Sequence, residues 1–156
     1  MKFIFSSILS LALCVSAQAQ LNQQWLNRYN AAGDYSDKAK DLVVNSGGNV
    51  FITGYTTTNG NHDYITMKLT SAGDTLWTRT YNGVGNGEDE ANAIAIDGSG
   101  NVYVCGDFQN VGTFDPSGVA DDLFTVGGSD AFFAKYNSNG QYQWGKNMGG
   151  SDFDAA

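Results

Sequence analysis

The sequence predicts an all-β fold built from a repeated four-stranded unit, and three observations lead to this prediction. The segment Gly48–Gly54 returns 52 residues later as Gly100–Gly106, and a fixed period of this size indicates a repeat architecture. Apolar and polar side chains alternate within each copy, which is the period of a β-strand and not of a helix. The chain contains 20 glycines but one proline, a composition typical of short strands joined by tight turns.

Each copy contains four segments with strand character, separated by turn sequences. These segments are residues 39–45, 49–57, 64–70 and 75–81 in the first copy and residues 91–97, 101–108, 130–136 and 141–147 in the second. Four antiparallel strands in about 50 residues, repeated along the chain, are typical of a β-propeller, in which each repeat forms one blade. The sequence therefore predicts a β-propeller segment with blades at residues 37–82 and 89–149 and the truncated start of a further blade at residues 150–156.

Residues 22–30 have the pattern of a fourth strand without the first three. Trp25 and Tyr29 stand four residues apart, as Trp77 and Tyr81 do in the first copy. We therefore expect residues 22–30 to supply the outer strand of the last blade and to close the ring, because an open sheet edge invites aggregation. A ring needs about four to eight blades, so we expect the chain to be a fragment of a larger propeller. A truncated gene product and a ring of several copies are the alternatives.

Residues 1–19 have the features of a signal peptide. A positive residue near the start is followed by an apolar stretch and by Ala17-Gln18-Ala19, the small-x-small pattern after which signal peptidase cuts. The apolar stretch is too short for a membrane anchor, which needs roughly 20 residues. Cys14 leaves lipidation as an alternative, although Leu13 precedes it where a small residue is required. We expect residues 20–156 to be secreted or displayed at the cell surface.

Charge and cysteine content limit the function classes. The formal net charge is -8, and such an acidic surface repels phosphate backbones, which argues against nucleic acid as a partner. No segment outside the leader is long and apolar enough for a transmembrane helix. Without residues 1–19, Cys105 is the only cysteine. Inside an apolar strand it is expected to behave as a small hydrophobic side chain.

The second copy carries the pattern Asp-x-Ala-x-x-Ile-x-x-Asp-x-x-Gly-Asn-Val-Tyr-Val-x-Gly at residues 89–106, then Phe114-Asp115-Pro116 and Gly-Ser-Asp-Ala-Phe-Phe-Ala-Lys-Tyr at residues 128–136. Together with Gly140 four residues before Trp144, this resembles the SBBP family of bacterial β-propeller repeats. The first copy is a looser match and lacks the Phe-Asp-Pro insert. The resemblance implies a secreted or surface propeller, often within a multidomain protein, and it implies no established chemistry.

We therefore expect a non-catalytic scaffold or binding module for an extracellular protein or glycan, without a cofactor unless calcium binds. The alternative is a propeller enzyme whose catalytic residues lie in blades or domains outside this segment. His62 is the only histidine and has neither a second histidine nor a cysteine near it in the sequence, so we interpret it as an exposed turn residue and not as a zinc ligand. Nothing in the sequence arranges a nucleophile with its base.

The second copy is longer than the first by an insert between Asp107 and Ser129, which we interpret as the recognition surface because loops on rigid scaffolds change without disturbing the core. A weaker hypothesis is that the acidic residues of the insert bind calcium. The alternative is that the insert is a solvated acidic loop. A second acidic loop, residues 97–101, spaces its oxygens as an EF-hand loop does but lacks the closing glutamate, so a turn explains it better. The expected calcium ligands are Asp115, Asp121 and Asp122, and the expected ligand-binding residues are Asp107, Phe108, Phe114, Asp115, Asp121 and Asp122.

Overall fold

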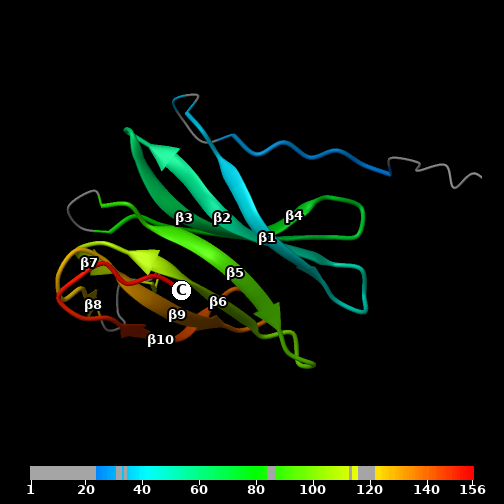
Figure 1. Ribbon diagram of the computed structural model, residues 1–156. Coiled ribbons are helices and arrows are strands. Elements are labelled where there is room, and N and C mark those ends of the chain that lie inside the picture. Colours follow the sequence, from blue (N-terminus) through cyan, green and yellow to red (C-terminus); the bar gives the residue numbers. More distant parts are fainter. Residues whose placement is uncertain (1–23, 31–32, 34, 84–86, 113, 116–121) are drawn as a thin grey trace, which may run out of the picture.

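The computed structural model describes residues 24–30, 33, 35–83, 87–112, 114–115 and 122–156, and within them every regular element is a β-strand (Figure 1). The first sheet is antiparallel in the order β1-β2-β3-β4. Its strands are β1 (Lys38–Val44), β2 (Val50–Thr58), β3 (Asn61–Leu69) and β4 (Thr75–Tyr81).

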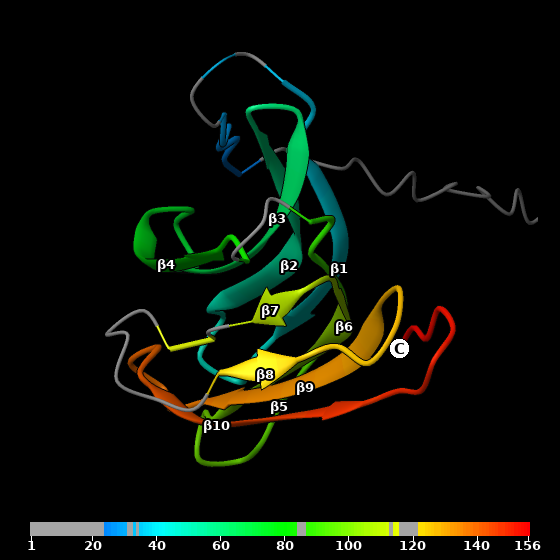
Figure 2. The same cartoon turned by 90° about the vertical axis from the view of Figure 1, so that its left-hand side faces the viewer.

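The second sheet repeats this arrangement in the order β5-β6-β9-β10. Its strands are β5 (Glu90–Ile96), β6 (Val102–Phe108), β9 (Asp130–Tyr136) and β10 (Tyr142–Met148). The insert adds a short hairpin, β7 (Val111–Gly112) and β8 (Leu123–Phe124), which lies beside the second sheet in Figure 2. The eight predicted strands are all present, each within three residues of its expected bounds, so the prediction of an all-β, propeller-like segment is confirmed at the level of two four-stranded antiparallel sheets. The number of blades and a closed ring are not established by these two sheets.

Each of the repeated segments, Gly48–Gly54 and Gly100–Gly106, ends in a glycine, and the structure shows the reason. Gly54 and Gly106 lie opposite a bulge in the first strand of their sheet. A Cβ atom at Gly54 would stand 1.9 Å from the Lys38 carbonyl oxygen, and a Cβ at Gly106 would stand 1.9 Å from that of Glu90. Since backbone approaches backbone this closely, no residue with a side chain fits without moving the strand.

The core lies between the two sheets and is largely aromatic. Phe51 and Tyr64 of the first sheet are at most 1% exposed, as are Phe132 and Tyr136 of the second. The Tyr64 and Tyr136 hydroxyls hydrogen-bond each other across the interface, so neither polar end is buried without a partner. Each large side chain buried here contributes roughly 1.5–3 kcal/mol through removal of apolar surface from water.

The same tryptophan contact occurs twice along the chain. Trp77 donates its indole N–H to the Ser138 carbonyl at 3.3 Å. A Cβ atom on Gly140 would stand only 2.8 Å from the Trp77 ring. Trp25 donates to the Ser71 carbonyl at 3.0 Å and covers Gly73 in the same way. Each tryptophan therefore docks on the turn between the third and fourth strands of the sheet that follows it.

The predicted closing strand at residues 22–30 is not confirmed. Residues 22–23 lie outside the described residues, and residues 24–30 have an irregular backbone. The hydrogen bonds of Trp25 and Asn27 to the 70–74 turn come from side chains. A strand forms only where a neighbouring strand accepts its backbone hydrogen bonds, and residues 24–30 lie beside a turn instead.

Residues 150–156 form hydrogen bonds equivalent to those at the start of the second repeat. The Asp154 amide donates to the Ser129 carbonyl at 2.8 Å, as the Asp89 amide does to the His62 carbonyl at 2.9 Å. The Asp154 carboxylate accepts the Gly150 amide, and the Asp89 carboxylate accepts the Gly83 amide, both at 2.7 Å. The third copy thus starts with the same local contacts, while its blade remains a prediction.

Replacing Trp77 with alanine should lower the free energy of unfolding by about 3 kcal/mol, because it removes a large side chain from the inter-sheet contact. Trp144 has the equivalent position in the second sheet but is 42% exposed, so Trp144→Ala should change the free energy of unfolding by about 1 kcal/mol or less. Urea unfolding followed by circular dichroism measures both. Equal losses for the two variants would contradict the docking role of Trp77.

Asp89 has no exposed surface and joins the link before β5 to the end of β6. Its carboxylate accepts the Gly83 amide at 2.7 Å and the Gln109 amide at 3.1 Å. Burial raises the pKa of Asp89 to about 6, although the two amides act in the opposite direction. The folded protein therefore keeps a proton on this carboxyl at pH values where the unfolded chain has lost it.

This difference in pKa makes the contribution of Asp89 to stability fall as the pH rises from about 4 to about 6. Two pKa units correspond to about 3 kcal/mol. We expect the difference in unfolding free energy between the wild type and Asp89→Asn to become smaller by up to about 3 kcal/mol from pH 4 to pH 7. Urea unfolding in metal-free buffer at several pH values tests this, and a constant difference across the range would contradict it.

Candidate functional site

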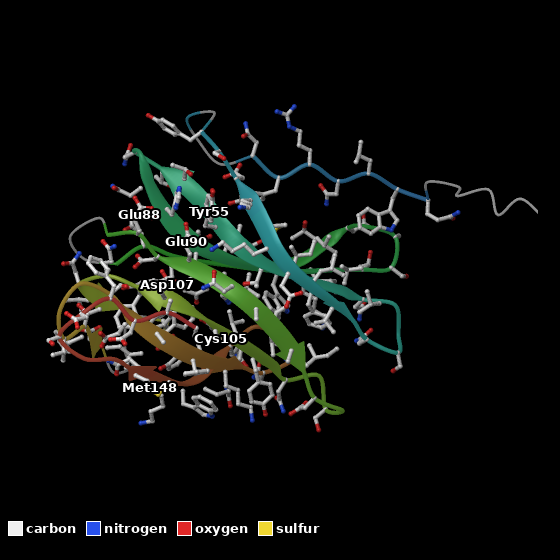
Figure 3. All side chains as sticks on the ribbon, in the orientation of Figure 1. Tyr55, Glu88, Glu90, Cys105, Asp107 and Met148 are labelled. Atoms are coloured by element: carbon white, nitrogen blue, oxygen red, sulfur yellow. The ribbon has the colours of Figure 1, made fainter. Side chains whose placement is uncertain are left out.

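Polar side chains gather where the first sheet meets β5, and we call this group the junction cluster. In Figure 3, Tyr55, Glu88 and Glu90 lie together at this place with Asp107 beside them. β5 packs against β1 and β2, which brings side chains of two successive repeats within bonding distance. The junction cluster consists of Lys40, Tyr55, His62, Glu88, Glu90, Asn92 and Asp107.

His62 is the centre of the junction cluster. Its Nδ1 lies 2.8 Å from Glu88 Oε2 and 2.5 Å from Glu90 Oε1. Its ring is stacked on Tyr55 with 3.8 Å between centroids and 15° between planes. The backbone amide of His62 also donates to Glu88 Oε2 at 3.2 Å. Stacking and hydrogen bonding together fix the direction in which Nδ1 points.

Lys40 holds the other side of Glu90. Its ammonium forms an ion pair with Glu90 Oε2 and donates to Asn92 Oδ1 at 2.6 Å. Burial alone would raise the pKa of Glu90, but the hydrogen bonds and charges of Lys40 and His62 outweigh it and hold that pKa below its usual range. Glu90 is therefore a carboxylate in the folded protein at neutral pH.

Asn92 links the junction cluster to β6 by donating to Asp107 Oδ1 at 2.8 Å. Burial raises the pKa of Asp107, and the Asn92 hydrogen bond offsets part of that effect. Asp107, predicted as a residue of the binding loop, thus belongs to the junction cluster.

The interpretation of His62 as an exposed turn residue is wrong. His62 lies in β3, its side chain is 29% exposed, and two carboxylates contact it. Those carboxylates come from positions 26 and 28 residues later in the sequence, in the following repeat. The one available signal was the repeat itself, since β5 of the second sheet packs against strands of the first sheet.

Among the residues that the structure describes, His62, Glu88 and Glu90 form a group that could hold a metal ion. One donor atom from each lies within 4.8 Å of the other two.

Asp115 is half-buried and Asp122 is exposed, while Asp121 lies outside the described residues. The calcium site predicted for these three aspartates therefore remains a prediction.

The predicted turn at residues 97–101 is present. The Asp97 carboxylate accepts the Ser99 and Asn101 amides, each at 2.9 Å, and the Asn101 side-chain amide at 2.7 Å. The Asn101 hydrogen bonds are the largest cause of the lowered pKa of Asp97. These bonds account for the aspartate without a bound ion.

The insert is anchored by aromatic side chains in the core. Phe108 is fully buried and Phe114 is 2% exposed, so both lie inside the protein instead of at its surface. The Phe114 ring centroid is 4.5 Å from that of Phe132 and 5.0 Å from that of Tyr81, and the Phe114 carbonyl accepts the Tyr136 hydroxyl at 3.1 Å. Their burial supports an anchoring role, as aromatic residues that fix the insert to the blade.

The outer face of the second sheet carries a shallow apolar hollow of about 200 Å³. Cys105 lies in it and is a free thiol. Burial raises the pKa of the Cys105 thiol, which makes it a poor nucleophile at neutral pH. The other residues that line the hollow include Ala93, Ala95, Tyr103, Phe133 and Trp144.

Comparison with known proteins bears on the repeat. Residues 77–107, from β4 through β6, match the model of the SBBP family, described as a beta-propeller repeat. The match confirms the resemblance for this stretch, which includes Glu88 and Glu90. A search of curated proteins found no match to the chain.

In the described part of the chain, no helix has the length and apolar character needed to cross a membrane.

Proposed function

We propose, on the basis of the SBBP β-propeller repeat at residues 77–107, that this chain is part of an exported propeller that acts as a non-catalytic scaffold and binds an extracellular protein or glycan. The observation that carries this proposal is the insert of the second repeat. It is anchored in the core by Phe114, and it displays exposed apolar side chains at the edge of a rigid sheet. Loops held in this way by a scaffold commonly carry recognition.

The two sheets are successive blades in this proposal, and residues 24–30 lie where the outer strand of a preceding blade would be. The equivalent contacts of Trp25 and Trp77 with the following turn support this arrangement. Trp144 and the apolar hollow beside it would then face a further blade. A propeller of this kind needs about four to eight blades.

The recognition surface is the short segment from Phe124 to Val126, whose backbone is held in place. Asn147 donates to the Phe124 carbonyl at 3.0 Å, and the Thr125 amide donates to the Asn110 carbonyl at 2.9 Å. The Phe124 and Val126 side chains are each 61% exposed. A pre-ordered aromatic and aliphatic pair loses little conformational entropy on binding, and it suits the apolar face of a sugar ring or a protein side chain.

The contacts of the ionisable side chains favour a scaffold over an enzyme. Lys40 pairs with Glu90, and His62 contacts both Glu88 and Glu90. These groups therefore link two repeats instead of pointing at a substrate. A propeller enzyme assembled from other blades is the competing hypothesis. It predicts turnover of a substrate by the complete protein, which a scaffold does not.

The double variant Phe124→Ser/Val126→Ser should bind its ligand at least about tenfold more weakly, because it removes the displayed apolar pair. Its unfolding free energy should stay within about 1 kcal/mol of the wild type, since both side chains are exposed. Arrays of glycans and of extracellular proteins identify the ligand, and biolayer interferometry measures the affinity. Deleting residues 110–125 is not a suitable test, because it removes Phe114 from the core.

Leu42 and Leu76 provide a matched control, since they are 60% and 52% exposed on the first sheet. Leu42→Ser/Leu76→Ser should leave binding unchanged. Equal loss of binding in both double variants, or unchanged binding in both, would contradict the recognition surface. Chemical conversion of the captured ligand would favour an enzyme.

We expect cleavage after Ala19 when the chain is expressed with its own leader in a bacterial host. Intact-mass and N-terminal analysis of the exported protein should show a chain that starts at Gln20, and Ala17→Leu/Ala19→Leu should retain the leader because signal peptidase requires small residues. A lipid-modified N-terminus at Cys14, abolished by Cys14→Ala, would replace secretion with membrane anchoring. Accumulation of the uncleaved wild type would contradict export by this leader.

A further inference from the structure

We propose that His62, Glu88 and Glu90 bind one divalent transition-metal ion, such as Zn²⁺, at the junction between the two repeats. The set combines an imidazole nitrogen from β3 with one carboxylate oxygen before β5 and another at the start of β5. Three protein ligands with a fourth position open to water are the coordination of catalytic zinc sites, whereas structural zinc sites have four protein ligands.

The donor atoms need small movements to hold an ion. In a tetrahedral site with bonds of about 2.0–2.2 Å, neighbouring donor atoms lie about 3.4 Å apart. His62 Nδ1 now lies 2.8 Å from Glu88 Oε2 and 2.5 Å from Glu90 Oε1. Each glutamate oxygen would therefore move away from His62 Nδ1 by less than about 1 Å, within the reach of glutamate side-chain rotation.

The ligands are oriented by partners outside the coordination set. Tyr55 stacks on the His62 ring, and Lys40 holds the second oxygen of Glu90. The Glu88 backbone amide donates to the Gln109 side chain at 3.3 Å. Such second-shell contacts reduce the cost of ordering the ligands and raise metal affinity.

The local charge favours a dication. Two carboxyl groups, Glu88 and Glu90, lie beside one ammonium group, that of Lys40. Asp63, next to His62 in the chain, is 3% exposed, and its Oδ1 has no hydrogen-bond partner among the described residues. A bound cation would balance this excess of negative charge.

The site is not a requirement of the repeat. At the next junction, Ser129 occupies the place of His62, and Ala155 follows Asp154 as Glu90 follows Asp89. Phe153 precedes Asp154 as Glu88 precedes Asp89, so that junction keeps the backbone contact of Asp154 without the imidazole and without either carboxylate. The ligand set is therefore an addition to the first junction and not part of the fold.

The composition of the set selects the kind of metal. Imidazole suits zinc, copper, iron and nickel, whereas Ca²⁺ takes six to eight oxygen ligands. The inference is independent of the proposed scaffold function, because a propeller with or without a glycan or protein ligand can contain this ion.

Isothermal titration of the metal-free full chain, without a polyhistidine tag, tests the site with Zn²⁺ and with Ca²⁺. We expect one Zn²⁺ per chain, a raised melting temperature, and no competition from excess Ca²⁺. With Co²⁺ as the probe, visible absorption bands should report nitrogen and oxygen ligands. His62→Gln and Glu88→Gln should each weaken Zn²⁺ binding at least about tenfold.

Two controls separate this site from surface binding and from misfolding. Asp152→Asn removes an exposed carboxylate elsewhere and should leave Zn²⁺ affinity unchanged. Circular dichroism establishes that the variants are folded, and Glu88→Gln serves if His62→Gln is not, because Glu88 precedes β5 and its side chain is 44% exposed. Absence of Zn²⁺ binding, equal affinity in wild type and both ligand variants, or displacement of Zn²⁺ by Ca²⁺ would overturn the proposal and leave an ion-pair network that joins the repeats.

Discussion

Each sheet has an apolar face that can be removed from water only by the neighbouring repeat. Phe51 and Trp77 of the first sheet meet this need by packing against the second, where Gly140 leaves space for the indole ring. The aromatic core, the tyrosine pair and the junction cluster all depend on this contact, because it sets the distance between the sheets. On the outer face of the second sheet, the equivalent Trp144 remains 42% exposed. Within the described residues, the contact between the two sheets is therefore one complete junction, and Trp144 lies on a face that no other sheet covers.

Much of the fold was predictable because the repeat makes its own pattern visible. Alternating side chains and paired glycines located the eight strands within three residues, since both are local requirements of a strand and its turn. The requirement for glycine at position 54 was not predictable from the local pattern, because it comes from the carbonyl of Lys38 on the neighbouring strand. The strand expected at residues 22–30 is not confirmed. A strand pattern specifies which residues can pair, but pairing also needs a partner strand, and Trp25 contacts a turn instead.

The candidate site was much harder to predict than the strands. Asp107, Phe108 and Phe114 were grouped because they follow one another in the insert, yet the structure sends Asp107 to the junction cluster and both phenylalanines to the core. His62 was dismissed because its neighbours in the sequence offer no second ligand. Its partners arrive from the next repeat, through packing of β5 on the first sheet. Proximity in the sequence is therefore a poor guide to chemistry in a repeat protein, where contacts between repeats bring the side chains together.

Comparison of equivalent positions offers a better guide. Residues that recur with the same contact, such as Trp25 with Trp77 and Asp89 with Asp154, maintain the architecture. Positions that differ between repeats are free to carry a function. His62 replaces a serine of the next repeat, and the insert replaces a short loop of the previous one. His62 lies at the start of β3, outside the aromatic core, whereas the insert is anchored in that core by Phe114 and displays Phe124 and Val126 at its edge. A metal site or a binding surface can therefore be added at these places while the strands keep their order.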